Sequence, residues 1–122
     1  MIVRIDTRLI TDWASFHEVF ALLFGFPDYY GRNRNAWIDC MTYLNDPVVK
    51  DTAVSAKPGE VVVLHLEHII DFKKRCPEVY DAIVECSAFV NYRQIQCGKE
   101  PVLALSFFEN AELVEQLEGK KF

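Results

Sequence analysis

Apolar positions along the chain follow two patterns, and these predict where strands and helices lie. Short unbroken apolar runs, such as the one from Val61 to Leu64, are typical of strands buried on both faces of a sheet. Apolar positions that recur every three or four residues predict helices with one buried side. The segments predicted as strands are 1–5, 60–66 and 101–107. The segments predicted as helices are 12–24, 33–45, 68–74, 77–94 and 109–118.

Residues that favour helix ends support these boundaries. Thr11 or Asp12 can cap the first helix by accepting a hydrogen bond from a free backbone N–H, and Gly25 can end it. Asn33 is placed to cap the second helix in the same way. Pro77 suits the first turn of a later helix, where its missing N–H leaves no bond unmade.

The order of these elements predicts an α/β fold. Along the chain it is strand, helix, helix, strand, helix, helix, strand, helix. Strands that are separated by helices pair in parallel through crossover connections. We therefore expect a single domain over residues 1–122, with a three-stranded parallel sheet covered by helices and one extra C-terminal helix.

The segment 26–40 combines a loop, two adjacent tyrosines and a helix start. Pro27 and Gly31 favour a loop, because Pro fixes φ and Gly tolerates a positive φ. At about 100° per residue, the helix that follows turns one apolar stripe toward the core. This stripe consists of Ala36, Trp37, Cys40, Met41 and Leu44. The opposite side carries Asn35, Asp39, Thr42 and Asp46, with Ile38 and Tyr43 flanking them.

This outward side, together with Tyr29 and Tyr30, is a candidate protein-binding surface. Tyrosine offers a large rigid contact area at low entropy cost, and aromatic residues are enriched in interface cores. The same polar residues also fit an ordinary solvated helix face. The tyrosine pair also fits the edge of the core, with each hydroxyl in water. The residues alone leave both interpretations open.

The charge of the chain narrows the kinds of partner. Its 122 residues carry a net charge of −5 and give a pI of about 5.1. A general nucleic-acid binder needs a basic surface, so we expect no direct binding to nucleic acid. An acidic chain instead suits a basic protein partner, such as an enzyme that cleaves RNA.

The cysteines indicate a reducing compartment. They are Cys40, Cys76, Cys86 and Cys97. None forms a C-x-x-C pair, and no secretion signal precedes the first strand, so we expect reduced, mostly buried thiols in a cytoplasmic protein. No segment approaches the roughly 18 apolar residues that a membrane span needs.

No residue pattern predicts a cofactor or an enzymatic activity. His65 and His68 have an H-x-x-H spacing, but no further ligand completes a metal site. Cys40 and His17 are a conceivable nucleophile and base, but Cys40 falls on the buried stripe of its helix. We therefore expect no metal, no cofactor and no catalysis.

The segment 15–47 resembles the barstar family, whose members are small intracellular inhibitors of ribonuclease toxins. The matching positions are Tyr29, Tyr30, Gly31, Asn33, Ala36, Asp39, Cys40 and Thr42. The resemblance implies a barstar-like fold, in which the second helix and the loop before it plug the active site of the ribonuclease. It also implies that Asp39 mimics a substrate phosphate and that Tyr29 stacks beside the catalytic site. The family uses a glutamate on a later helix as well, for which Glu85 is the candidate.

The chain departs from the family pattern beside this predicted plug. Asn35 stands where the family often has an acidic residue, and Arg32 and Arg34 add positive charge. An insertion occupies residues 50 to 59 and should form a surface loop. These departures leave open a different ribonuclease or a toxin of another class.

We therefore predict an inhibitor, or immunity protein, that occludes the active site of a cognate ribonuclease toxin as a monomer in a 1:1 complex. The predicted partner-binding residues are Tyr29, Tyr30, Asn33, Asn35, Ile38, Asp39, Thr42, Tyr43, Asp46 and Glu85.

Two alternatives stay open. A barstar-fold interaction module would bind a toxin that is not a ribonuclease, or another regulatory partner. A small flavodoxin-like enzyme or ligand-binding domain would need a polar site at the carboxyl ends of the strands. The candidates for such a site are Asp6, His65, Glu67 and Ser106.

Overall fold

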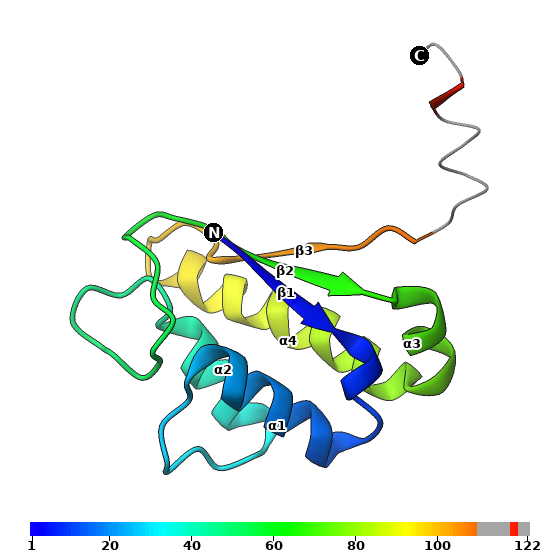
Figure 1. Cartoon of the computed structure of the whole chain (residues 1–122). Coiled ribbons are helices and arrows are strands. Elements are labelled where there is room, and N and C mark those ends of the chain that lie inside the picture. Colours follow the sequence, from blue (N-terminus) through cyan, green and yellow to red (C-terminus); the bar gives the residue numbers. More distant parts are fainter. Residues whose placement is uncertain (110–117, 120–122) are drawn as a thin grey trace.

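The computed structural model describes residues 1–109 and 118–119 of the chain. Its elements follow the order that the apolar pattern predicts (Figure 1). The strands are β1 (Ile2–Asp6), β2 (Val62–Glu67) and β3 (Leu103–Ser106). The helices are α1 (Trp13–Phe24), α2 (Arg34–Thr42), α3 (Ile69–Arg75) and α4 (Pro77–Gln96), and the short 3-10 helix η1 (Thr7–Leu9) follows β1. The predicted helix 109–118 lies outside the described residues, apart from its two ends.

The three strands form one parallel sheet with β2 in the centre. Val3 of β1 is level with Leu64 of β2, which in turn is level with Leu105 of β3. The helices α1, α2 and α4 lie below the sheet, and α3 lies at the end toward which the strands run (Figure 1). The predicted α/β class and the three-stranded parallel sheet are confirmed.

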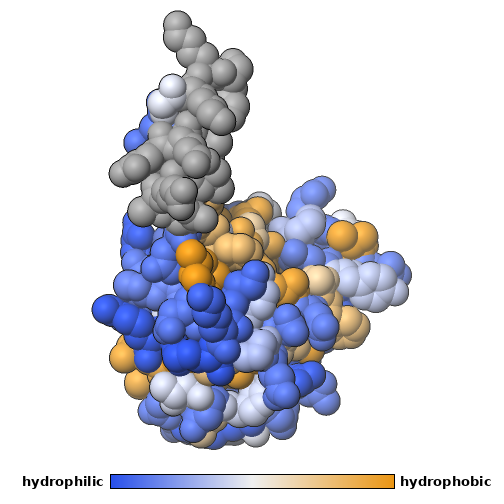
Figure 2. Space-filling view, turned by 90° about the vertical axis from the view of Figure 1, so that its right-hand side faces the viewer, coloured by the Kyte–Doolittle hydropathy of each residue, from blue (hydrophilic) through white to orange (hydrophobic). Residues whose placement is uncertain are grey.

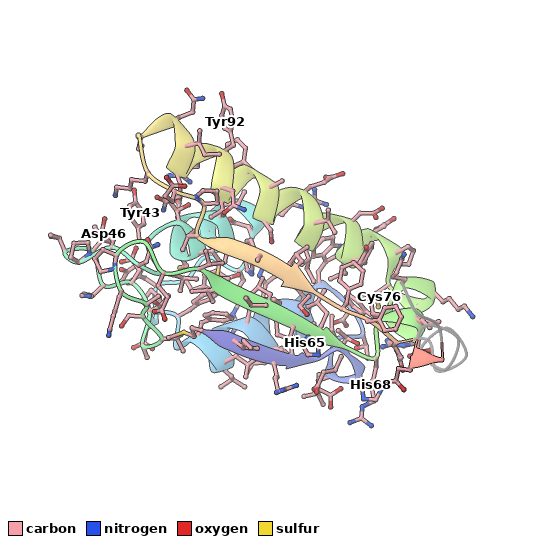
Figure 3. The ribbon with its side chains drawn as sticks, turned by 90° about the horizontal axis from the view of Figure 1, so that it is seen from above. Tyr43, Asp46, His65, His68, Cys76 and Tyr92 are labelled. Carbon is pink, nitrogen blue, oxygen red and sulfur yellow. The ribbon has the colours of Figure 1, made fainter. Side chains whose placement is uncertain are left out.

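Within the part of the chain that the structure describes, helices cover one face of this sheet and leave the other open. The strand β2 is buried at Val62, Leu64 and Leu66 and only partly buried at the residues between them. Figure 3 looks onto the other face, on which His65 lies and over which no helix of the described residues passes. The prediction of strands buried on both faces is therefore wrong. Val63 lies on the open face and extends the apolar run without being fully buried.

Aromatic side chains of α1 and α2 form the centre of the core. The ring centroids of Phe16 and Phe20 lie 6.2 and 5.5 Å from that of Trp37. Trp37 is 1% exposed, as its place on the predicted core stripe requires. Large aromatic side chains bury much apolar area, so these contacts hold α2 firmly against α1.

The predicted helix ends on both sides of the first long loop are confirmed. Asp12, and not Thr11, caps α1, because its carboxylate accepts the Ser15 N–H at 2.8 Å while the Ser15 hydroxyl accepts the Asp12 N–H at 3.0 Å. Gly25 ends α1 in the left-handed conformation, with a φ of 64°. Asn33 caps α2 by accepting the Ala36 N–H at 2.8 Å. Local sequence signals thus fix where α1 stops and α2 begins.

Hydrophobic area reaches the surface at the end of the molecule where α3 lies (Figure 2). Ile70 and Phe108 are exposed there. The ring of Phe107 meets Tyr80 of α4 edge-on, with 6.0 Å between the centroids. Glu109 accepts the Ile70 N–H at 3.2 Å. The segment after β3 is therefore tied to the first turn of α3.

The insertion 50–59 contains no helix or strand, as predicted, and it is attached to the end of α1. The Ala53 N–H donates to the Gly25 carbonyl at 3.2 Å, and the Val54 N–H donates to the Phe24 carbonyl at 3.1 Å. A Cβ added to Gly25 would overlap the Cβ of Ala53. The loop therefore packs against α1 at a point that has room only for glycine.

Replacing Gly25 by alanine should destabilise the protein more than replacing Gly98, which is the matched control. Both glycines have a positive φ, 64° and 76°, so alanine should cost roughly 1–2 kcal/mol of backbone strain at either position. Nothing lies within 4 Å of the Cβ added at Gly98, whereas at Gly25 the overlap with Ala53 should add about 1–3 kcal/mol. Urea unfolding of both variants measures the difference, and equal losses would contradict the close packing of the insertion.

Candidate functional site

Asp39 occupies the solvent-facing side of α2. Its side chain is 62% exposed, as the helical period predicts. One carboxylate oxygen, Oδ1, accepts a hydrogen bond from Nη1 of Arg93 on α4 at 2.8 Å. The other oxygen, Oδ2, has no hydrogen-bond partner among the described residues. The structure thus presents one carboxylate oxygen to solvent while Arg93 holds the other.

Two residues predicted to bind the partner, Thr42 on the outward side of α2 and Ile38 beside it, are buried instead. Ile38 and Thr42 are 8% and 7% exposed. The Thr42 hydroxyl donates to the Ile38 carbonyl, and the side-chain amide of Gln94 on α4 donates to the Thr42 carbonyl. Because α2 packs against α1 on one side and against α4 on another, more than one stripe of it is covered. The prediction that Ile38 and Thr42 face solvent is therefore wrong, and Tyr43 after them is half-buried.

Tyr29 is the most prominent side chain of the loop before α2. It is 78% exposed, and its hydroxyl donates to Oδ1 of Asp51 at 3.1 Å. This hydrogen bond and the charge of Asp51 raise the pKa of Tyr29. Asp51 belongs to the insertion 50–59 and was missed from the sequence, where nothing marks an aspartate of a surface loop as a partner of Tyr29. The insertion thus contributes a carboxylate to the predicted site.

Tyr30 fastens the same loop to α1. Its hydroxyl shares a hydrogen bond with Nδ1 of His17, which is 5% exposed, and its ring lies 4.7 Å from that of Phe26. Burial raises the pKa of Tyr30, so its hydroxyl keeps the proton. Burial lowers the pKa of His17, and the charge of Arg32 lowers it further. Tyr30 therefore acts as an anchor of the loop more than as a free contact residue.

Three other predicted site residues differ in what their side chains do. The side chain of Asn33 is engaged in capping α2, whereas Asn35 is exposed. Asp46 accepts the backbone N–H groups of Val48 and Val49 at 2.8 Å each, which lowers its pKa. Asn33 and Asp46 thus organise the chain on either side of α2, and Asn35 is available to a partner.

Glu85 is exposed on α4, apart from Asp39. It precedes Arg93, the partner of Asp39, by eight residues, which correspond to about 12 Å along a helix. Glu85 is therefore more than two turns of α4 away from the residue that contacts Asp39.

Charges of both signs meet around this surface. Asp39 pairs with Arg93, Glu18 pairs with Arg32 at 3.1 Å, and Lys99 lies 3.5 Å from Asp46. The net charge of −5 is therefore not concentrated on α2. A partner of this surface meets a mixture of carboxylates and guanidinium groups.

The Cys40 thiol beside this surface lacks the lowered pKa of a catalytic nucleophile. Cys40 is buried, as predicted, and burial raises its pKa to about 11, with further contributions from Asp51 and Asp39. The thiol therefore stays protonated near neutral pH, whereas a nucleophile requires the thiolate. His17, the base that the sequence offered for this thiol, instead shares a hydrogen bond with Tyr30.

The polar residues at the ends of the strands form separate pairs. Asp6 accepts from the Arg8 guanidinium at 2.9 Å, and Arg4 lies 3.9 Å from Glu67. Nδ1 of His65 lies 2.9 Å from the Ser106 hydroxyl on the open face of the sheet. The described residues contain no group of three or more His, Cys, Asp or Glu side chains that could hold a metal ion. Within the same part of the chain, no helix is both long and apolar enough to cross a membrane.

Comparison with protein families agrees with this architecture. A family model described as Barstar (barnase inhibitor) matches residues 1–105. The chain therefore belongs to the Barstar family, whose description is that of an inhibitor and not of an enzyme. The match ends within β3, so the predicted C-terminal helix lies beyond it. No curated protein matched the chain.

The folded protein should lose stability as the pH falls below about 6.5, the ordinary pKa of histidine. Because burial lowers the pKa of His17 in the folded state, the unfolded chain binds a proton first as the pH falls, which favours unfolding. One such group contributes at most about 1.4 kcal/mol per pH unit. Urea unfolding between about pH 7.5 and 5.5 measures the slope. His17→Gln should flatten it, and an unchanged slope in this variant would contradict a neutral buried His17.

Proposed function

We propose that this chain is an inhibitor that binds a barnase-like ribonuclease and occludes its active site with residues 29–45, which comprise the loop before α2, α2 itself and the turn after it. The observation that carries the proposal is the Asp39 carboxylate, which is 62% exposed on α2 and fixed by Arg93 at 2.8 Å. The exposed ring of Tyr29 lies on the loop that leads into the same helix.

The chemistry of a ribonuclease active site supports this role. Such a site binds the phosphates of RNA, so it presents cationic groups that a carboxylate can engage. A charge pair that becomes desolvated and hydrogen-bonded in an interface carries a large truncation cost, because the partner group is left buried and unpaired. Asp39 keeps its Oδ2 atom available for a bond of this kind.

The scaffold keeps the entropy cost of binding low. Trp37 holds α2 in the core, Asn33 caps it, and Asp51 restrains the side chain of Tyr29. A surface that is already ordered loses less conformational freedom when a partner binds. We assign direct contacts to Tyr29, Asn35, Asp39, Tyr43 and Glu85, and supporting roles to Tyr30, Asn33 and Asp46.

The complex that we propose has one inhibitor and one ribonuclease and forms in the cytoplasm, where the inhibitor protects the cell that makes it. A second candidate is an interaction module for a protein that is not a ribonuclease. The mixed charge around α2, with Arg32, Arg34 and Arg93 beside the carboxylates, favours this alternative over a purely acidic plug.

Barnase, the enzyme in the family description, is a defined probe for this function. The chain should inhibit cleavage of a fluorogenic RNA by barnase, with the end point of the titration at one inhibitor per enzyme. Micromolar concentrations detect any complex with a Kd of about 1 μM or below. Full RNA cleavage in roughly tenfold molar excess of the chain would reject inhibition of barnase-like ribonucleases and favour the second candidate.

Asp39→Ala should weaken the complex with barnase by roughly 2 kcal/mol or more, mostly through faster dissociation. The matched control is Asp81→Ala, another exposed aspartate, twelve residues or about 18 Å along α4 from Arg93. Surface plasmon resonance gives both rate constants for each variant. If Asp39→Ala dissociates no faster than Asp81→Ala, Asp39 is not the central contact.

Asp39→Asn should weaken binding to barnase. Adding Arg93→Gln should recover part of the lost binding free energy. Removing the carboxylate charge leaves the Arg93 guanidinium without its counterion, so an extra positive charge faces a basic active site. The double variant removes that repulsion. Titration calorimetry of the wild type, both single variants and the double variant gives the coupling free energy. A double variant that binds barnase no better than Asp39→Asn would contradict this electrostatic role of Arg93.

A further inference from the structure

A cavity of about 510 Å³ opens between the first half of α1 and the residues that begin α2. The residues that line it are Trp13, Ala14, His17, Arg32, Asn33 and Arg34. A water molecule occupies about 30 Å³ of the liquid, so the cavity is large enough for an amino-acid side chain and not only for a small ion. The two arginines are those that depart from the family pattern, and the inhibitory surface described above gives them no role.

The charged side chains among the residues that line this cavity are both cationic. Two guanidinium groups line it, and no carboxylate is among its described lining residues. His17 is close to neutral at pH 7, because burial and the charge of Arg32 lower its pKa. The cationic groups of the lining are therefore Arg32 and Arg34, although the chain as a whole has a net charge of −5.

Arg34 is positioned by an aromatic contact and not by a carboxylate. Its guanidinium carbon lies 5.0 Å from the centroid of the Trp13 ring, which is a cation–π arrangement. No ion pair to Arg34 is formed within residues 1–109 and 118–119. A guanidinium that contacts a ring in this way can still donate its N–H groups to a carboxylate. Arg34 is thus both ordered and available.

Arg32 is available to a smaller extent. It pairs with Glu18 at 3.1 Å, and both side chains are more than half exposed. An exposed pair of this kind contributes only about 0–1 kcal/mol, so a second carboxylate can share or replace Glu18 at little cost. Arg34 is therefore the principal cation of the cavity, and Arg32 supports it.

The cavity adjoins the loop that carries the tyrosines. His17, in its wall, shares a hydrogen bond with Tyr30, and Asn33, also in its wall, caps α2. A protein that covers Tyr29 and α2 therefore reaches the mouth of the cavity as well. The occupant that the charges favour is a carboxylate of such a protein, because the acidic chain as a whole repels a polyanion such as RNA.

We propose that this cavity receives an acidic side chain of the bound ribonuclease, whose carboxylate pairs with Arg34 and, at the rim, with Arg32. This inference rests on the proposed function, because it takes the ribonuclease as the partner. Recognition then uses both signs of charge, with a cation of the enzyme at Asp39 and an anion of the enzyme at Arg34. Ribonucleases that lack an acidic residue at the position facing Arg34 are bound less tightly, so Arg34 determines which ribonucleases are bound.

Charge reversal at Arg34 tests the proposal with barnase as the probe. Arg34→Glu should raise the Kd at least about tenfold, which corresponds to 1.4 kcal/mol. Arg34→Met keeps much of the apolar contact with Trp13 but removes the charge, so it should raise the Kd less than Arg34→Glu does. The matched control is Arg4→Glu, which makes the same change of net charge on β1 at the open face of the sheet. Arg4→Glu should alter the Kd less than about threefold. Thermal unfolding of each variant establishes that it is folded.

A compensating change in barnase identifies the acidic group. When each Asp and Glu of barnase is replaced singly by Lys, one of these variants should bind Arg34→Glu more tightly than unmodified barnase does. If the wild-type chain binds barnase but Arg34→Glu and Arg4→Glu bind equally well, the inference fails and the proposed function stands. If the wild-type chain does not bind barnase, both fail.

A separate measurement distinguishes a protein carboxylate from a nucleic-acid phosphate. Fluorescence anisotropy of a labelled single-stranded RNA oligomer is recorded as the chain is added in the absence of barnase. No binding at micromolar concentrations is the expected result. RNA binding that is lost in Arg34→Glu and kept in Arg4→Glu would assign the cavity to phosphate and overturn the proposal.

Discussion

The fixed position of α2 is the constraint on which the rest of the structure depends. This helix has nine residues, which is too short to be stable in water alone. Its stability comes from Trp37, which packs against Phe16 and Phe20 of α1, and from α4, which closes its other side. The direction in which Asp39 points is therefore set by tertiary packing on two sides of the helix. The apolar periodicity of the helix alone does not set it.

Features of this packing that depend on nearby residues were predicted from the sequence, whereas contacts between distant residues were not. The cap at Asn33, the left-handed stop at Gly25 and the burial of Trp37 depend on residues within a turn or two, and all three were predicted. The burial of Thr42 depends on Gln94, which is 52 residues away. The apolar periodicity of a helix indicates one buried side. It cannot show that a neighbouring helix also covers a second side.

The same limit explains the errors in the sheet and in the site. The apolar run of β2 predicted burial on both faces, because Val63 is as apolar as a core residue. No helix of residues 1–109 covers the face on which it lies. The partner of Tyr29 is Asp51, 22 residues later, and the partner of Asp39 is Arg93, 54 residues later. Such pairs carry no local signal, since exposed charged residues are common in loops and on helices. The order of the elements was predictable, but the contacts between them were not.

The pairing of charges around α2 contributes little to stability and bears mainly on the recognition that we propose. Exposed ion pairs such as Asp39–Arg93 and Glu18–Arg32 each contribute little to folding, because water and salt screen them. In an interface the same charges lose that screening. A uniformly basic partner would gain at Asp39 and be repelled at Arg93 and Arg34, whereas a partner with a matching alternation of charge would gain at both kinds of position. Under the proposed function, such a surface discriminates among basic proteins, and the excess negative charge of the chain acts mainly at longer range, where it speeds their approach.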